Sequence, residues 1–440
     1  MRVLLIQSPL GGAEPPVYPA GLACLAPVLR RAGHVVRVFD PNISSSPPDS
    51  PDLPDPTGQA GSARELAAII GDFAPEAVGV SLRNIDSTNK RVVVFYYQFF
   101  KELLQEIRAL TKAPIIAGGS GFSMFAERVM ADEPLVDYGV YLEGENAFAA
   151  LLGNLAAPWK APSVFYRSNG RVEFSGPGEK AEGPDIGPLD FSVLPLAPYL
   201  GMPWGVGLET KRGCALSCVY CPYGFLNGKR YRLKSPETVA EEAANLEAQG
   251  ARRFTFLDSV FNIPKEHAAA VCRALIARGT GLKWSAWFNE RELDRELLDL
   301  AIAAGCENVI FSPDAFSDAA LKKLGKSIST ADIERAFSLV RDRTEIEASW
   351  NFFKNPPGQS LSAFLSMARF VVKARRAMGR RAHFEFNSLR VEPHTALEKL
   401  AIEEGIIRQG EDLLKPVYFT QKSTRYIEWC MNAGLRALKK

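Results

Sequence analysis

The sequence predicts an α/β protein in which a doubly wound parallel sheet is followed by a partial (β/α)6 barrel. Residues 1–155 and 204–400 each alternate short β-rich runs with helical segments, the pattern of parallel sheets. Between them, residues 156–203 lose this periodicity and become rich in proline, which predicts a linker. Residues 401–440 are left as a C-terminal tail or cap. At 440 residues the chain exceeds what one hydrophobic core usually serves, so several domains are expected.

Five strands are predicted in the first stretch, at residues 3–7, 35–39, 77–81, 115–117 and 139–142. Gly11 and Gly12 do not open a helix with G-x-G-x-x-G spacing, so a dinucleotide fingerprint is weak. The five-stranded arrangement suits a flavodoxin-like or Rossmann-like domain. Ligands of such sheets bind beyond the carboxyl ends of the strands. We therefore expect a binding site in the loops at residues 82–86, 118–121 and 143–145.

Within the linker, residues 164–174 predict a hairpin with an Asn169-Gly170 turn. The second stretch contains six predicted strands, at residues 205–212, 253–257, 283–288, 308–312, 347–353 and 383–389. Helical segments separate them, and Ser235-Pro236 is a favourable helix start. Six strands interleaved with helices predict a partial (β/α)6 TIM barrel, whose functional residues lie at the carboxyl edge.

Composition excludes several classes of protein. The net charge of +2 gives no basic footprint of the kind that nucleic-acid-binding proteins show. The longest apolar and aromatic run, residues 92–100, is much shorter than the ~20 residues that span a bilayer. The N-terminal apolar run is too short for a signal peptide. The cysteines number seven, and those outside residues 214–221 are scattered, which predicts a reducing cytoplasm.

Three cysteines, Cys214, Cys218 and Cys221, follow the spacing C-x3-C-x2-C between Gly213 and Pro222. On a helix these positions would share one face, so packing in a core is one interpretation. The glycine and the proline favour a tight loop instead. Three thiolates could hold zinc or an iron-sulfur cluster, and both usually take a fourth protein ligand. No fourth cysteine or histidine lies nearby in the sequence, which predicts an open coordination site.

This cysteine motif, with Tyr220 before its last cysteine, resembles the signature of the radical S-adenosylmethionine (SAM) superfamily. The resemblance implies that Cys214, Cys218 and Cys221 hold a [4Fe-4S] cluster whose remaining iron is chelated by SAM. Polar residues after successive core strands match the positions that bind SAM in this family. The SAM-binding residues that the resemblance implies are Tyr220, Asp258, Ser259, Asn289, Ser312, Asp314, Asn351, Arg390 and Val391. Each has an alternative role as an ordinary strand-end or helix-capping residue.

The first stretch resembles the cobalamin-binding domain that precedes many radical SAM cores, through residues 18–40, 117–122 and 141–145. It lacks the D-x-H-x-x-G motif that supplies an axial histidine elsewhere. The implied cobalamin-binding residues are Leu82, Arg83, Asn84, Gly118, Gly119, Ser120, Gly121, Glu143 and Gly144. In this subfamily the lower face of cobalt is typically met by the loop after strand three. Arg83 is equally well explained as a salt-bridged surface residue.

Together these resemblances identify the chain as a member of the cobalamin-binding (class B) radical SAM enzymes. They imply a methyltransferase that passes a SAM-derived methyl group through methylcobalamin to an unactivated carbon, or phosphorus, of a small molecule or peptide. The alternatives are a non-methylating cyclisation or rearrangement, a polar methylation, and a non-catalytic corrinoid or redox-responsive binding protein. The resemblance also implies an electron donor such as flavodoxin or ferredoxin. We expect the protein to be a monomer that neither binds nucleic acid nor inserts into a membrane. The aromatic tail could cap the barrel mouth or cover its opposite end.

Overall fold

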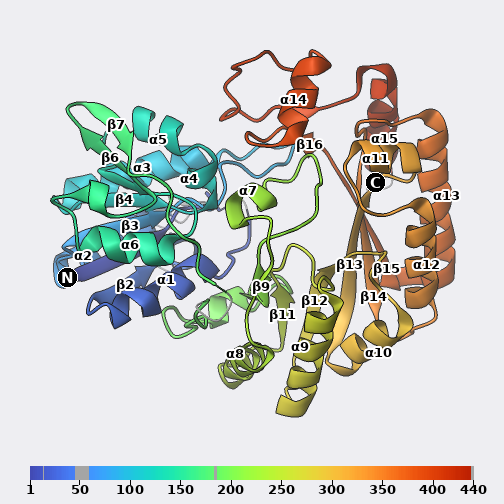
Figure 1. The fold of residues 1–440 in the computed structure, drawn as a ribbon, viewed down its shortest axis with the longest axis horizontal. Coiled ribbons are helices and arrows are strands. Elements are labelled where there is room, and N and C mark those ends of the chain that lie inside the picture. The colour runs from blue at the N-terminus through green and yellow to red at the C-terminus, as the bar shows by residue number, and fades with distance from the viewer. Residues whose placement is uncertain (13, 45–58, 183–185, 438–440) are drawn as a thin grey trace, which may run out of the picture. The chain divides into compact units, whose positions relative to one another are not determined.

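The computed structural model describes residues 1–12, 14–44, 59–182 and 186–437 (Figure 1). They divide into two compact units. The described residues of the first unit fall within Met1–Ser87, Val92–Gly207 and Ala248–Ala251, and those of the second within Thr88–Arg91, Leu208–Glu247 and Arg252–Lys440. The stretch predicted as a linker, residues 156–203, therefore groups with the first unit, and the tail groups with the second.

The first unit is built on a seven-stranded sheet in the order β2-β1-β3-β4-β5-β6-β7. Its strands are β1 (Arg2–Gln7), β2 (Val35–Phe39), β3 (Ala77–Ser81), β4 (Ile115–Gly118), β5 (Tyr138–Val140), β6 (Val164–Ser168) and β7 (Arg171–Phe174). The first five pair in parallel in the predicted flavodoxin-like order, while β6 and β7 are antiparallel. The predicted hairpin thus extends this sheet instead of standing in a linker. Central β1 is buried at five of six positions, as a strand covered on both faces should be.

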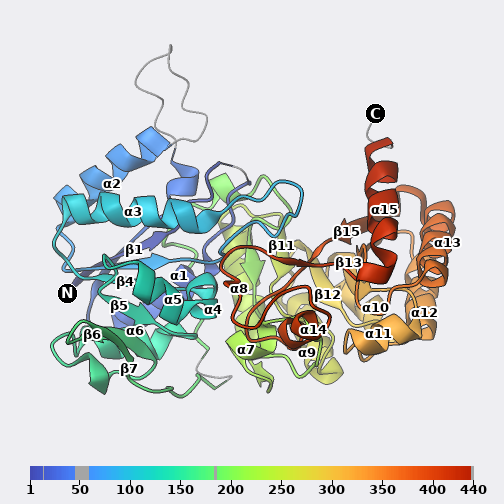
Figure 2. The same ribbon diagram turned by 90° about the horizontal axis from the view of Figure 1, so that it is seen from above.

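Helices cover both faces of this sheet. They are α1 (Ala20–Arg31), α2 (Gln59–Phe73), α3 (Tyr96–Leu110), α4 (Ser120–Met124), α5 (Ala126–Asp132) and α6 (Gly144–Leu152). Helices α2 and α3 pack side by side, and α1 packs beside α6 (Figures 1 and 2). Leu22, Leu29, Phe148 and Leu151 of the α1 and α6 pair are buried in one hydrophobic cluster with Leu5 of the sheet. This cluster fixes the strands whose carboxyl ends carry the predicted ligand loops.

The second unit contains a six-stranded sheet in the order β15-β14-β13-β12-β11-β8. These strands are β8 (Gly207–Leu208), β11 (Arg253–Phe256), β12 (Lys283–Phe288), β13 (Cys306–Asp314), β14 (Glu347–Phe353) and β15 (Ala382–Asn387). Successive strands from β11 to β15 pair in parallel, and β8 and β15 form the two edges. Two short two-stranded antiparallel sheets accompany them, β9 (Lys211–Arg212) with β10 (Arg232–Leu233), and β16 (Leu389–Arg390) with β17 (Tyr418–Phe419). The predicted partial (β/α)6 barrel is confirmed.

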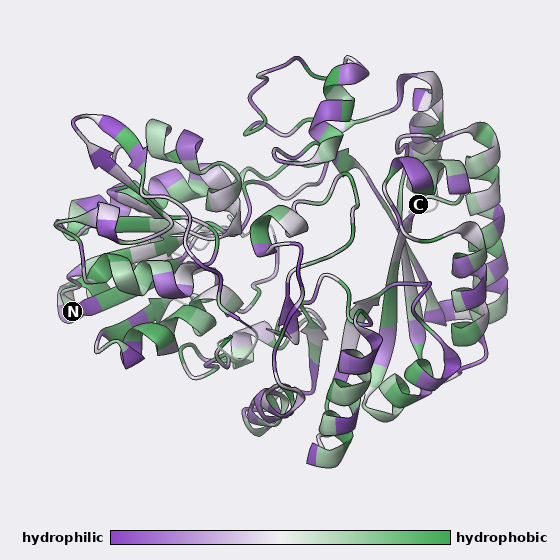
Figure 3. Ribbon diagram, viewed as in Figure 1, coloured by the Kyte–Doolittle hydropathy of each residue, from purple (hydrophilic) through white to green (hydrophobic). Residues whose placement is uncertain are grey.

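The helices of the second unit follow its strands in turn. They are α7 (Tyr223–Asn227), α8 (Pro236–Ala248), α9 (Lys265–Arg278), α10 (Arg295–Ala303), α11 (Asp318–Lys323), α12 (Thr330–Arg341), α13 (Leu361–Met378), α14 (Ala396–Glu403) and α15 (Arg425–Ala437). Helix α9 packs on α10, α10 on α12 and α12 on α13, and these helices carry both hydrophobic and hydrophilic positions (Figure 3). Their starts use local caps: Ser235 Oγ accepts the amide of Thr238 (3.1 Å), as predicted, and Ser329 forms a capping box with Asp332.

The C-terminal tail lies at the carboxyl edge of the barrel strands. Tyr418–Phe419 pairs with Leu389–Arg390, just after β15. Gln421 accepts the side-chain amide of Asn355 at its carbonyl (2.9 Å) and the backbone amide of Gly358 at Oε1 (2.7 Å), both in the loop after β14. Of the two positions that the sequence left open for the tail, the structure therefore selects the mouth of the barrel. In the described part of the chain, no helix is both long and apolar enough to cross a membrane.

Candidate cofactor sites

The three cysteines of the C-x3-C-x2-C motif lie on the loop between β9 and α7. Cys214 is buried, Cys218 and Cys221 are half-buried, and none forms a disulfide. The loop starts at Gly213, whose φ of +91° belongs to the region that favours glycine. A Cβ there would lie 2.0 Å from the carbonyl oxygen of Arg230, so no other residue fits without movement of the backbone. The tight loop predicted from the glycine is present.

Two other segments of the second unit hold this loop in place. The amide of Val219 donates to the carbonyl of Leu324 (3.0 Å), and the carbonyl of Val219 accepts the amide of Leu397 at the start of α14 (2.7 Å). Gly325 lies so close to the loop that a Cβ would come 2.3 Å from the carbonyl oxygen of Ser217. The loop that carries the thiols is thus braced, in the sense that backbone hydrogen bonds and a close backbone contact tie it to two other segments.

Burial raises the pKa of Cys221 to about 11 and also raises the pKa of Cys218. The nearby thiol of Cys214 contributes in the same direction to both, while the ammonium of Lys326 opposes it. Without a metal these thiols are therefore protonated at neutral pH, and metal binding must release their protons.

Among the described residues, no three His, Cys, Asp or Glu side chains gather closely enough for a single metal ion. A cubane carries its irons at separate corners, so its thiolates need not converge on one point. Three free thiols on one braced loop fit the chemistry of such a ligand set.

Tyr220, next to Cys221, reaches the end of β13. Its Oη donates to Asp314 Oδ2 (2.5 Å), and Asp314 also forms an ion pair with Lys326, whose Nζ donates to the carbonyl of Ser312 (2.7 Å). Burial, followed by the charge of Asp314, raises the pKa of Tyr220 well above its usual value. The structure thus brings three predicted SAM residues together around a lysine that the sequence analysis did not identify.

Two further predicted SAM residues lie on the neighbouring strand ends. Asn351 on β14 donates from Nδ2 to Ser312 Oγ (3.3 Å). Asn289 follows β12 and uses its Oδ1 to accept the backbone amide of Arg291 (3.0 Å). Asn289 therefore has the ordinary strand-end role of its alternative interpretation, in the turn after β12, and its contact with SAM stays a prediction.

Asp258 follows β11 and is buried. Its carboxylate accepts the backbone amide of Thr210 (2.8 Å) at Oδ1, and the hydroxyl of Thr210 (2.5 Å) and Nζ of Lys211 (2.8 Å) at Oδ2. Both carboxylate oxygens are thus engaged, which argues for a structural role in tying β9 to β11. Ser259 instead donates to the carbonyl of Gly213 (3.3 Å), at the start of the cysteine loop. Contacts of these two residues with SAM remain predictions.

Arg390 and Val391 lie near the tail. Arg390 donates to Glu392 Oε2 (2.6 Å) and to the carbonyl of Leu413 (3.1 Å), and Val391 donates its amide to the carbonyl of Val417 (2.8 Å). These contacts fold residues 413–419 back onto the barrel edge. Contact of this pair with SAM is not tested by these hydrogen bonds and stays a prediction.

In the first unit the loops after β3 and β4 are bonded to each other. Leu82 donates its amide to the carbonyl of Gly118 (2.8 Å), and Ser120 Oγ donates to the carbonyl of Arg83 (2.6 Å). A Cβ on Gly119 would lie 2.7 Å from the carbonyl oxygen of Leu82, and one on Gly121 would come 2.9 Å from the same atom. The glycines are explained by this close backbone approach. Seven of the nine predicted cobalamin residues, 82–84 and 118–121, are thus gathered in one place.

The remaining two, Glu143 and Gly144, open helix α6 after β5. The preceding Leu142 donates its amide to Ser123 Oγ in α4 (2.9 Å), which joins this third loop to the loop after β4. Ser8, directly after β1, is 2 % exposed, and its hydroxyl has no hydrogen-bond partner among the described residues. A buried donor without a partner at this edge fits a domain whose ligand supplies the missing contact.

Arg83 is half-buried, and its guanidinium acts on Asp40, at the end of β2. Burial raises the pKa of Asp40, and the hydroxyl of Tyr199 (2.7 Å), the hydrogen bonds from Asn42 and the charge of Arg83 oppose the rise. This effect on Asp40 is compatible with both interpretations of Arg83. Its role toward cobalt stays a prediction.

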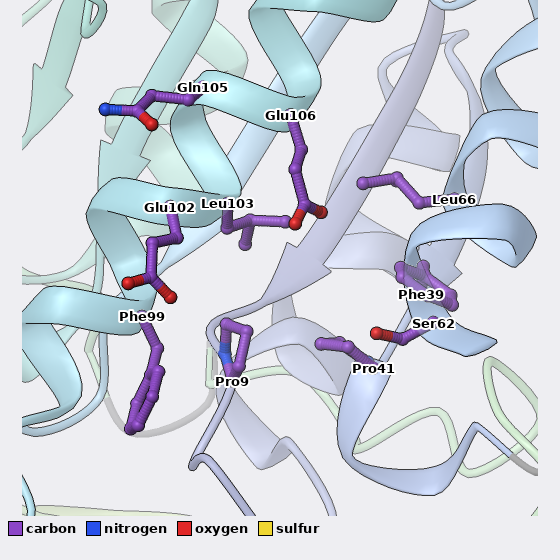
Figure 4. Close-up of a pocket in the computed structure, with 10 residues that line it drawn as sticks. All are labelled: Pro9, Phe39, Pro41, Ser62, Leu66, Phe99, Glu102, Leu103, Gln105 and Glu106. Carbon is purple, nitrogen blue, oxygen red and sulfur yellow. The ribbon is translucent and has the colours of Figure 1, made fainter. Parts of the chain in front are cut away.

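A pocket of about 300 Å³ opens between α2, α3 and the ends of β1 and β2 (Figure 4). Pro9, Phe39 and Leu66 line it together with two carboxylates of α3, Glu102 and Glu106. Burial, followed by the charge of Glu102, raises the pKa of Glu106. None of the predicted cobalamin residues lines this pocket.

Two buried charged residues of this region, Lys326 and Glu290, were not predicted from the sequence. Lys326 reaches Asp314 from the segment between α11 and α12, and Glu290 is buried beside Asn289. A lysine in a short loop carries no sequence pattern that indicates burial. Glu290 directly follows a predicted site residue at a strand end, which was a usable signal.

Comparison with known protein families identifies both units. Residues 10–152 match the B12 binding domain, and residues 208–371 match the radical SAM superfamily. These matches confirm the three predicted cofactors, a [4Fe-4S] cluster and SAM for the second domain and cobalamin for the first.

Several curated proteins are similar to most of the chain. An uncharacterized methyltransferase of Pyrococcus horikoshii is 26% identical over 341 residues, 75% of this chain and 69% of that protein. The cytidylyl-2-hydroxyethylphosphonate methyltransferase of Streptomyces wedmorensis is 25% identical over 370 residues, 74% of this chain and 66% of its own length. The tryptophan 2-C-methyltransferase of Streptomyces laurentii is 24% identical over 302 residues, 54% of this chain and 50% of its own length. The chain thus spans half to about two thirds of these relatives.

Solved structures share the fold. The radical SAM methyltransferase TsrM from Kitasatospora setae, with cobalamin and a [4Fe-4S] cluster bound, superposes with a TM-score of 0.76 at 22% identity, over 96% of this chain and 79% of that chain. The cobalamin-dependent SAM radical enzyme OxsB, with aqua-cobalamin and SAM bound, gives a TM-score of 0.76 at 14% identity, over 98% of this chain and 66% of that chain. At these identities the likeness confirms the predicted fold of both units.

Proposed function

Because the chain belongs to the cobalamin-binding radical SAM enzyme family, we propose that it transfers a methyl group from SAM, by way of cobalamin, to a small-molecule or peptide substrate. The observation that carries this proposal is the presence, in one chain, of three free thiols on a braced C-x3-C-x2-C loop and a B12 binding domain. Relatives that match half to three quarters of the chain are named methyltransferases, which supports methyl transfer over other reactions.

When bound, the cluster supplies an electron to SAM, SAM supplies the radical and the methyl group, and cobalamin carries that methyl group. The chain's own contribution is positional. The thiols of Cys214, Cys218 and Cys221 would hold the cluster after losing their protons. Tyr220, held by Asp314, stands directly beside them and closes one side of the site.

The acceptor atom is a carbon or phosphorus of the substrate. The relatives act on different molecules by name, a cytidylyl phosphonate in one case and tryptophan in another. The fold likeness to OxsB, described only as a cobalamin-dependent SAM radical enzyme, keeps a non-methylating reaction as the second candidate.

The proposal is tested by the products of SAM. Full-length protein is reconstituted with iron, sulfide and cobalamin, and is then incubated with SAM and a reductant. Formation of both 5'-deoxyadenosine and S-adenosylhomocysteine supports radical methyl transfer. The first product alone indicates rearrangement, the second alone indicates polar methylation, and neither indicates a binding protein without turnover.

The ligand set is tested by Cys218→Ala, with Cys430→Ala as the matched control. Cys430 is exposed and lies outside the motif, so its loss leaves the iron content unchanged. We expect Cys218→Ala to lose the charge-transfer absorption of the cluster and SAM turnover. A Cys218→Ala protein with normal iron content and normal turnover would contradict the assignment of the cluster.

A further inference from the structure

A second pocket, of about 600 Å³, lies within the second unit. Lys354 and Ser388, which directly follow β14 and β15, line it, so it opens at the carboxyl edge of the barrel strands. Helix α15 lines another side with Arg425, Tyr426 and Trp429. None of the residues assigned above to the cluster, SAM or cobalamin lines this pocket.

Lys354 is the buried cation of the pocket. Its residue is 6 % exposed, and its ammonium has no hydrogen-bond or ion-pair partner among the described residues. Burial lowers the pKa of Lys354, and the charge of Arg91 lowers it further. The charge of Glu428 opposes this lowering, but Lys90 is already paired with that carboxylate. A bound anion would therefore offset the remaining excess of positive charge around Lys354.

Positive charge is concentrated around this lysine. Lys90, Arg91, Lys354 and Arg425 line the pocket with a single carboxylate, that of Glu428. Lys90 already occupies that carboxylate (2.8 Å). The pocket lining therefore carries a formal excess of three positive charges, whereas the whole chain carries a net charge of +2. This local excess is not a consequence of composition.

Two aromatic side chains stand on the α15 side of the pocket. Tyr426 is 49 % exposed and Trp429 is 73 % exposed, three residues apart on the same helix. Exposed rings of this size present a flat apolar surface that suits stacking against a planar group. They also present it beside the cations, so one ligand can use both.

We propose that this pocket binds the anionic end of a ring-containing substrate, with a phosphate or carboxylate group on Lys354 and Arg425 and the ring against Trp429. That the bound anion belongs to the substrate rests on the proposed function, whereas binding of an anion in the pocket does not. The pocket and the cysteine loop are neighbours along β14, because Phe353, next to Lys354, packs edge-on against the ring of Tyr220 at 4.9 Å between centroids. An anion held at Lys354 is thus anchored beside the SAM site.

The test measures binding to the full-length protein by titration calorimetry at low salt. The probes are cytidine 5'-monophosphate, indole-3-acetate, inorganic phosphate and cytidine. A phosphate-specific pocket binds the nucleotide best, and a carboxylate-specific pocket binds indole-3-acetate best. Cytidine, which lacks the anion, is expected to bind at least about tenfold more weakly than the nucleotide, because charge-assisted hydrogen bonds are lost.

Lys354→Met and Arg425→Gln remove the proposed anion contacts, and Arg380→Gln removes an exposed arginine elsewhere in the second unit as the matched control. We expect the first two to weaken binding of the preferred anion about 10- to 100-fold and the control to leave it unchanged. Lys354→Met is also expected to melt no lower than the native protein, since it removes one positive charge from a pocket where Lys90 and Arg91 repel it. That result separates lost binding from lost folding.

Absence of saturable binding for every anionic probe, or equal affinity in native protein and Lys354→Met, would overturn the proposal. These outcomes are independent of SAM turnover. A protein that cleaves SAM but binds no anion fails only this inference, and a protein that binds the anion without turning over SAM fails only the proposed function.

Discussion

Glu290 provides a sharp test of the electrostatics near the predicted SAM residues. It lies two residues beyond β12, is 2 % exposed, and its Oε1 is buried without a hydrogen-bond partner among the described residues. Burial raises the pKa of Glu290 to about 7, although the ammonium of Lys326 opposes the rise. We predict that Glu290→Gln, which keeps the shape and removes the charge, stabilises the protein above pH 7.

The magnitude follows from the two pKa values. In the unfolded chain this carboxyl loses its proton near pH 4.5, and in the folded protein only near pH 7. Between these values the folded state keeps a proton that the unfolded state has lost, so raising the pH favours unfolding. A difference of about 2.5 pKa units corresponds to about 3 kcal/mol, present in full above pH 7 and absent below pH 4.5.

The assay compares urea unfolding of native protein and Glu290→Gln at pH 5 and pH 8.5, with Glu292→Gln as the control. Glu292 is exposed, so its substitution should change neither value. At pH 5, just above the pKa of the unfolded state, the variant should be more stable by less than about 1 kcal/mol. At pH 8.5 the variant should be more stable by up to about 3 kcal/mol. An advantage that is equal at both pH values, or larger at pH 5, would refute the argument.

Two further predictions concern the frame of the cysteine loop. Gly213→Ala should lower the free energy of unfolding by at least about 2 kcal/mol more than Gly250→Ala. Both glycines have φ near +90°, but only at Gly213 would an added Cβ lie 2.0 Å from a backbone carbonyl oxygen. Equal losses of stability in chemical denaturation would contradict this close contact. Asp314→Asn should lower the free energy of unfolding by about 3–5 kcal/mol at pH 7, because it leaves the buried ammonium of Lys326 without its ion-pair partner. Adding Lys326→Met should restore much of that stability. A double variant that is no more stable than Asp314→Asn would show that the ion pair is not the cause of the loss.

Much of the fold could be predicted because its determinants are local. Runs such as β1 and the capped start of α8 depend on a few consecutive residues, and both were located from the sequence. The hairpin at Asn169-Gly170 was also predicted from its turn. Its union with the first sheet was not, because strand pairing with β5 depends on residues about 25 positions away.

In the candidate site, too, features set by consecutive residues were predicted from the sequence, and contacts between distant residues were not. The cysteine motif is contiguous, so its resemblance to the radical SAM signature, which implies the cluster ligands, was visible in the sequence. The strand-end residues were identified by position, and position does not reveal whether a side chain is already engaged. Asp258 is bound by Thr210 and Lys211, whereas Tyr220 and Asp314 meet across a separation of 94 residues. Such partners are fixed only by tertiary structure.

Unsatisfied polar groups are therefore a better guide to ligand contacts than strand-end position alone. The hydroxyl of Ser8 after β1 and Oε1 of Glu290 after β12 are buried without a hydrogen-bond partner among the described residues. Lys354, directly after β14, is a 6 % exposed residue whose ammonium forms no hydrogen bond or ion pair with the described residues. Each lies within two residues of the carboxyl end of a parallel strand, the edge at which both folds bind their ligands. Since a buried polar group without a partner is costly, a ligand that supplies one gains affinity at that point. Substitution of these three residues should accordingly weaken ligand binding more than it lowers stability, whereas substitution of the engaged Asp258 should do the reverse.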